Sequence, residues 1–326
     1  MSCNTGIYDP CFMGVDSIGS TLIINELENN YKSFLDWGFL NAGGYVNVNI
    51  PTSNIVGFNL HVLRPTLDKN FALNRVWQTP RKDWVYESGI VFGSSTPIQI
   101  SGIYVNNTFY PGPTGTSVLP YKINYPEGRI VFASGISPSS SVQMNYSYRT
   151  VQTYKMEEFP YWQEIQQKSL ENKTGFAISG SGDFSIGSEH RIQLPAVIIE
   201  TSPGSRSKPF RLGDKSLIMQ QDMLLHIISD HRSDRNTIVD ILKLQEDREI
   251  WLYNTNSIIK SGVYPINYDG TKNQSGQNYN IIVNNMDYRW LLCRILNVNV
   301  SDILFSNIKM HGSVVRLTNE IIFTAF

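Results

Sequence analysis

Residues 215–250 read KSLIMQQDMLLHIISDHRSDRNTIVDILKLQEDREI and contain two different hydrophobic patterns. Residues 215–230 are apolar in long runs, which predicts a long β-strand or a strand with a bulge. The later part predicts an amphipathic helix, because apolar residues recur there at helical spacing and Ser233 or Asp234 can cap its first turn. The apolar stripe of this helix consists of Ile238, Ile241, Leu242 and Leu244.

Further strands are expected on both sides of this stretch. The segment IQLPAVIIET (192–201) precedes it, and three segments follow: NYNIIVNN (278–285), YRWLLCRILNVNV (288–300) and SVVRLTNEIIFTAF (313–326). The order β-β-α-β-β-β predicts that residues 191–326 form an α+β domain, an antiparallel sheet with one packed helix.

The first 190 residues divide into three parts. Residues 1–44 predict an amino-terminal arm and an amphipathic helix over residues 18–40. Residues 45–155 alternate between apolar and polar positions and are interrupted by turn residues, which predicts an antiparallel β-sandwich or barrel. Residues 156–190 are predicted to be a linker or mobile segment, because ISGSGDFSIGSEH (178–190) is rich in Gly and Ser. Within it, PYWQEIQQKSLENKTG (160–175) could form a short helix or an arm. The whole chain is therefore expected to be α+β and rich in strands. The apolar stripe of the first helix is Leu22, Ile23, Leu27, Tyr31, Phe34 and Leu35.

Composition limits the classes of function. Charged residues make up 17% of the chain, and 27 Lys and Arg against 28 Asp and Glu give a net charge of −1. No overall basic field therefore attracts nucleic acid or an anionic membrane. The odd, sparse set Cys3, Cys11 and Cys293 argues against a disulfide framework, and Cys293 is expected in the core. Without a secretory signal or a long apolar run, we expect folding in a cytoplasm and no membrane partner.

Catalytic and metal-binding motifs are missing from the sequence. It contains no P-loop, no GxSxG elbow and no HExxH pair, so we expect no enzyme, no cofactor and no metal site. His226 and His231, which are flanked by acidic residues, are interpreted as a polar turn rather than as metal ligands.

One charge feature stands out, a basic loop with Arg206, Lys208 and Arg211. We expect this loop to be solvated or to contact a partner. The alternative is that it faces a DNA-filled channel and contacts DNA without sequence specificity.

Two sets of phrases resemble proteins of tailed phages. NELENNYKSFLDWGFLNAGGYVNVNIPTS (25–53), KDWVYESGI (82–90), ISGIYVNNTFYP (100–111) and INYPEGRIVF (123–132) resemble virion structural proteins of contractile-tailed phages of marine cyanobacteria. The carboxy-terminal order, with LPAVIIE, DRNTIVDIL, IWLY, YPINYDGT and VVRLTNEIIF, is similar to tail-terminator or tail-completion proteins.

The resemblance implies a virion protein that is assembled in a bacterial cytoplasm. It implies a homo-oligomer, commonly a hexameric ring, which caps the tail tube or sheath and joins it to the neck. Its partners would be other neck and tail proteins, namely tube, sheath or connector. Two alternatives stay open. One is a baseplate, fibre-attachment or capsid-decoration module, and the other is a polysaccharide hydrolase hidden in a β-rich fold, with Trp and Tyr as a sugar-binding surface.

Overall fold

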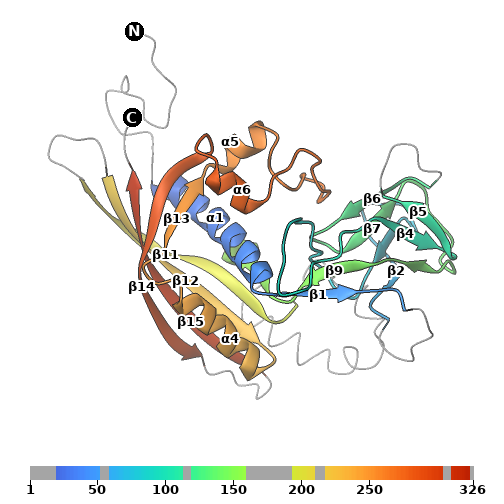
Figure 1. The fold of residues 1–326 in the computed structure, drawn as a ribbon, viewed down its shortest axis with the longest axis horizontal. Helices are drawn as coiled ribbons and strands as arrows, with labels where there is room; N and C mark the ends of the chain where they lie inside the picture. Colours follow the sequence, from blue (N-terminus) through green and yellow to red (C-terminus); the bar gives the residue numbers. More distant parts are fainter. Residues whose placement is uncertain are drawn as a thin grey trace, which may run out of the picture.

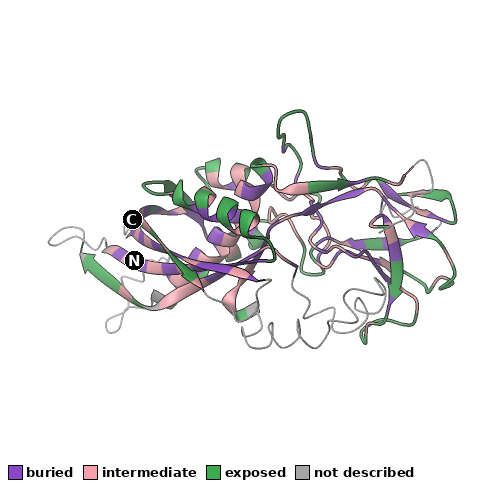
Figure 2. Cartoon of the chain, turned by 90° about the horizontal axis from the view of Figure 1, so that it is seen from below, coloured by how far each residue is buried: buried purple, intermediate pink, exposed green. Residues whose placement is uncertain are grey.

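The computed structural model describes residues 20–51, 59–112, 119–158, 193–209, 217–303 and 310–323. Strands outnumber helices in these residues, so the predicted α+β, β-rich fold class is confirmed. Figure 1 shows two halves side by side along the long axis: a sheet with its helices at the left, and a smaller all-β region at the right. Buried residues occur in both halves (Figure 2), and each half has its own apolar core.

The all-β half is built from short antiparallel strands. Seven of them form one sheet in the order β5-β4-β8-β2-β3-β7-β6, and β1 pairs with β9 in a separate ribbon. The bounds are β1 Tyr45–Val48, β2 Val62–Thr66, β3 Val76–Gln78, β4 Gly102–Val105, β5 Thr108–Pro111, β6 Tyr121–Asn124, β7 Arg129–Phe132, β8 Val142–Gln143 and β9 Tyr146–Arg149.

The core of this half lies between the sheet and the ribbon. Tyr146 from the ribbon is fully buried in the same apolar cluster as Trp77 and Phe132 from the sheet. The rings of Trp77 and Phe132 meet edge to face at 6.5 Å, a favoured arrangement for aromatic pairs. Strands β6 and β7 form an antiparallel hairpin across Pro126 and Gly128.

The other half is one six-stranded sheet in the order β10-β11-β12-β15-β14-β13. Its pairs are antiparallel except β10 with β11, which are parallel. The predicted purely antiparallel sheet is therefore corrected at one edge, where residues 156–195 provide the length that a parallel connection needs. The bounds are β10 Gln152–Lys155, β11 Ala196–Pro209, β12 Leu217–Ser229, β13 Glu249–Tyr253, β14 Arg289–Ile303 and β15 His311–Phe323, and a short 3-10 helix (Met156–Glu158) follows β10.

Helix α1 (Ser20–Asn41) and helix α4 (Arg232–Lys243) pack against the same face of this sheet. Leu27 and Tyr31 of α1 share one core with Leu225 of β12 and Leu242 of α4. The prediction of one packed helix was therefore wrong. The amphipathic stripe of α1 was predicted, but its partner sheet begins more than 100 residues further along the chain.

The predicted domain boundaries shift accordingly. Helix α1 belongs to the carboxy-terminal core rather than to a separate part ending at residue 44, and β10 joins the carboxy-terminal sheet. The all-β half therefore spans about residues 45–149 rather than 45–155. Most of the predicted linker, residues 159–192, lies outside the described residues.

Residues 278–285, predicted to be a strand, form helix α6 (Tyr279–Asn284). The sheet position beside β14 is taken instead by β13, which comes directly after α4 in the sequence. A further short helix, α5 (Thr255–Lys260), is capped by Asn254, whose side chain accepts a bond from Ser257 N. For α4 the residue before the first turn is His231, not the predicted Ser233 or Asp234.

Candidate functional site

A large cavity lies where the two halves meet. It has a volume of about 620 Å³ and is lined by α1, the segment around Glu87, β9, β10 and the chain between α5 and α6. Its wall carries charged side chains of both signs, including Lys32, Asp36, Asp83 and Arg149.

Arg149, at the end of β9, is the centre of this charge cluster. Its side chain is only 3% exposed. Its Nη1 donates to Asp83 Oδ1 at 3.0 Å, its Nη2 pairs with Glu87 Oε1, and its guanidinium lies 5.2 Å from the ring centre of Tyr86. The arrangement pairs one buried cation with two carboxylates and holds residues 83–87 against β9.

Burial and charge act against each other in this cluster. Burial raises the pKa of Glu87 and raises the pKa of Asp83 to about 6, although Arg149 opposes both shifts. Burial lowers the pKa of Arg149, but the carboxylates of Glu87 and Asp83 outweigh this, so its pKa lies well above its ordinary value. The guanidinium therefore stays charged at any physiological pH.

The chain between α5 and α6 connects the two halves. Lys272 Nζ donates to Tyr86 O at 2.9 Å, and Asn278 Nδ2 donates to Ser88 O at 2.7 Å. Tyr125 N, at the end of β6, donates to Gly270 O at 3.0 Å. This connection, rich in Gly, Asn and Ser, is thus ordered by contacts within its own chain.

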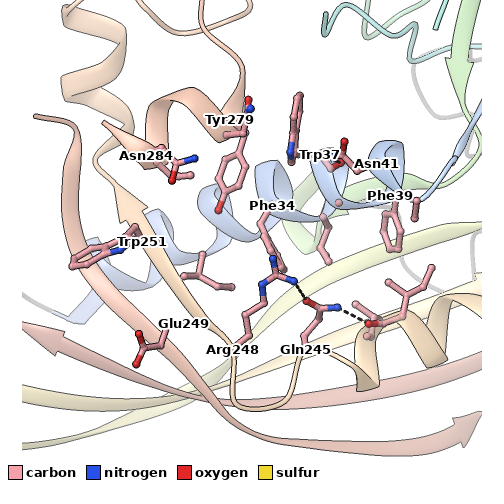
Figure 3. A pocket seen from close by; sticks show the side chains of 18 residues that line it. Phe34, Trp37, Phe39, Asn41, Gln245, Arg248, Glu249, Trp251, Tyr279 and Asn284 are labelled. Atoms are coloured by element: carbon pink, nitrogen blue, oxygen red, sulfur yellow. Dashed lines mark hydrogen bonds between the residues drawn. The ribbon is translucent and has the colours of Figure 1, made fainter. Parts of the chain in front are cut away.

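The second cavity, of about 510 Å³, lies between α1, α6 and the turn after α4 (Figure 3). Its aromatic residues include Phe34 and Tyr279, whose ring centres are 6.3 Å apart. Arg248 lies 5.3 Å from the ring centre of Phe34 and donates to Gln245 Oε1 at 2.8 Å. These groups form a groove of mixed polarity in which the Arg248 guanidinium stacks on Phe34.

The predicted basic loop is largely a strand. Arg206 and Lys208 lie exposed on β11, which runs through Gly204 with a register shift between Thr201 and Ser205. The strand continues through Pro203 and Gly204, residues that favour loops, because a bulge accommodates them there. Arg211 lies outside the described residues. Arg206 and Lys208 are therefore near one another along one strand, on the face opposite the helices.

That face, opposite the helices, carries paired polar side chains. Asp222 of β12 pairs with Arg316 of β15 and accepts from Thr318 Oγ1 at 2.8 Å. The bond from Arg316 lowers the pKa of Asp222. His226 Nε2 lies 2.5 Å from Glu200 Oε2 on the same face.

The histidines predicted to form a polar turn are separated. His226 is on β12, and His231 is exposed before α4. Within the described ranges, no group of three or more His, Cys, Asp and Glu side chains could hold a metal ion. Cys293 is buried as expected, and burial raises the pKa of its thiol to about 12. No helix in the described part of the chain is long and apolar enough to cross a membrane.

Two strand edges of the six-stranded sheet are uncovered. Strand β10 covers only the first four residues of β11, and β13 covers only the first part of β14. In the described part of the chain, no strand pairs with residues 200–209 on the side away from β12. None pairs with residues 296–303 on the side away from β15. We call these the β11 edge segment and the β14 edge segment.

Sequence reasoning found Arg206 and Lys208 but missed the Arg149 cluster and both edge segments. The acids that pair with Arg149 lie more than 60 residues away in the sequence. The only local signal was an arginine at the end of an aromatic strand. Neither a known family model nor a curated protein matches this sequence.

Proposed function

We propose that this chain is a structural protein of a tailed-phage virion that forms a ring at the neck or head-proximal end of the tail. It would act there as a tail terminator, a sheath-capping protein or a connector. The proposal starts from the resemblance of its phrases to phage virion proteins. Its partners would be further copies of itself, commonly six, and the adjoining tube, sheath or connector proteins.

The observation that carries the proposal is the pair of uncovered edge segments on opposite sides of one sheet. Unpaired strand edges are ready to pair with another chain. Two different edges on one molecule favour head-to-tail contacts, which close into a ring when the rotation between copies permits. The broad polar face between these edges also suits a protein that contacts other structural proteins.

Two experiments test this role: electron microscopy of the purified full-length protein, and immunogold labelling of phage particles. We expect closed rings from the protein and label at the head-proximal end of the tail. Label confined to distal fibres or to the capsid surface contradicts the proposal.

A second role, as a baseplate, fibre-attachment or capsid-decoration module, is favoured by one observation. The all-β half exposes several large apolar side chains, which mark contact surfaces when they gather. These include Leu67, Leu73, Val91, Phe92 and Phe109. Substituting Leu67 and Leu73 by Ser in the full chain would prevent incorporation at the capsid, baseplate or fibre in this second role. Under the first role, ring formation would not change.

A further inference from the structure

We infer that copies of this chain join edge to edge, with the β11 edge segment of one copy pairing with the β14 edge segment of the next. The inference rests on the proposed ring-forming function and specifies the surfaces that make the ring. The result is one continuous sheet that passes through every copy.

The two edge segments lie at diagonally opposite corners of the sheet. Residues 200–209 of β11 lie level with residues 217–224 of β12. Residues 297–303 of β14 lie, across β15, level with residues 222–228 of β12. Because β10 and β13 are short, each leaves part of its neighbouring strand unpaired. The β14 edge segment of one copy can therefore lie beside the β11 edge segment of the next copy, beyond the end of β10.

Strand direction suits this junction. β11, β12, β15 and β14 alternate in direction, so β11 and β14 run antiparallel to each other. A rotation that relates one copy to the next about an axis nearly parallel to the strands leaves these strand directions unchanged. The new pair would therefore be antiparallel, like the long pairs inside the sheet.

The stagger also fits a closed barrel. Arg206, near the middle of its edge segment, is level with Gln220, whereas Asn299 in the other segment is level with Leu224. Aligning Arg206 with Asn299 shifts each copy by four residues, or ~13 Å, across four long strands that span ~19 Å. The strands then tilt by about 35° from the barrel axis. The resulting ratio of one residue of shear per strand is the ratio found in (β/α)₈ barrels.

Side chains match in this register. An even shift keeps Arg206 and Asn299 on the same face of the joined sheet, the one opposite the helices. Lys208 then lies across from Asn297, so each exposed cation meets an uncharged amide rather than another cation. On the other face, the half-exposed Val300 packs at the edge of the helix-covered core and would gain cover.

A charge exchange in the full-length protein tests the pairing. Asn299→Lys places two cations opposite each other, and we expect each interface to weaken by up to about fivefold and the fraction of rings to fall. Adding Arg206→Glu to that variant should restore the rings. Asn284→Lys is the matched control, because it puts the same charge on an exposed residue of α6.

Native mass spectrometry measures the assembly, and hydrogen exchange measures the amides of both edge segments. Rings that persist in Asn299→Lys, with edge amides that exchange equally in rings and monomers, overturn the pairing but leave the ring function standing. A wild-type protein that stays monomeric at every concentration overturns both the strand pairing and the ring function. This holds even if contacts within the same chain protect its edge amides from exchange.

Discussion

Arg149 is the cation that compensates the buried carboxylates at the junction of the two halves, since it pairs with both Glu87 and Asp83. Removing one partner of a buried ion pair leaves the other charges uncompensated. We expect Arg149→Met to lower the free energy of unfolding by about 3–5 kcal/mol, measured by urea denaturation.

The matched control is Arg294→Met, which removes an exposed arginine 3.0 Å from Asp247. Exposed pairs contribute little, so we expect a loss below about 1 kcal/mol. Equal losses in the two variants would show that the Arg149 cluster is no more important than a surface pair.

Asp83 should leave a signature in the pH dependence of stability. Burial raises its pKa from 3.8 to about 6, so the folded state holds its proton more tightly than the unfolded state. The stabilisation is complete below pH ~4 and is lost as the pH rises through about 6. We expect Asp83→Asn to flatten the decline in the free energy of unfolding over this interval, measured by urea titrations at several pH values.

Asp287→Asn, which changes an exposed carboxyl, is the control and should keep the wild-type slope. An unchanged slope in Asp83→Asn would contradict the assignment of this pH dependence to Asp83.

The side-chain amide of Asn30 fixes helix α1 to the sheet by bonding both backbone groups of one β13 residue, as a neighbouring strand would. Asn30 Nδ2 donates to Tyr253 O at 2.9 Å, and Asn30 Oδ1 accepts from Tyr253 N at 3.0 Å. Asn30→Ala would leave two buried backbone groups of β13 unpaired, at about 1–3 kcal/mol each. We therefore expect a loss of about 2–6 kcal/mol in the free energy of unfolding, measured by denaturant titration.

The adjacent Asn29 provides a control on the same helix. Its only described side-chain bond is a weak one of 3.4 Å to Thr255 Oγ1. Asn29→Ala should therefore cost less than about 1 kcal/mol. A similar loss in both variants would mean that helix propensity, rather than the bond to β13, sets the effect.

Elements differ in how far the sequence predicts them. α1 and α4 were predictable because their apolar residues recur over several turns. The short α6 was predicted as a strand, because its run Ile281–Val283 favours strands and is too short to show a helical period. Its helical form depends on Ile282, which is buried in a cluster with Tyr253 and Ile258. That tertiary contact could not be read from the local sequence.

At the scale of the whole molecule, the sequence predicted two folded regions but not how they are joined. The connection brings together residues far apart in the sequence, such as Lys122 and Asp269, which are 147 residues apart. The edge segments were also hidden, because an edge is defined by where neighbouring strands stop. Local patterns predict strands but not the lengths over which they pair.

Gly270 offers a test of how tightly the two halves are coupled. Its φ is +76°, and a Cβ there would lie 2.5 Å from Asn124 Oδ1. Asn124 cannot move freely, because its amide donates to Asp269 O and accepts from Glu127 N. Gly270→Ala should therefore push the connecting segment away from β6 and weaken the contact between the halves.

Gly262→Ala separates this steric effect from backbone strain. Gly262 has a similar φ of +72°, but a Cβ there meets nothing within 4 Å. Both variants carry the penalty of about 1 kcal/mol for a left-handed alanine. We expect calorimetry to show two separated unfolding transitions for Gly270→Ala and an unsplit profile for Gly262→Ala. A single transition in both would mean that the Arg149 cluster and α1 couple the halves without the connecting segment.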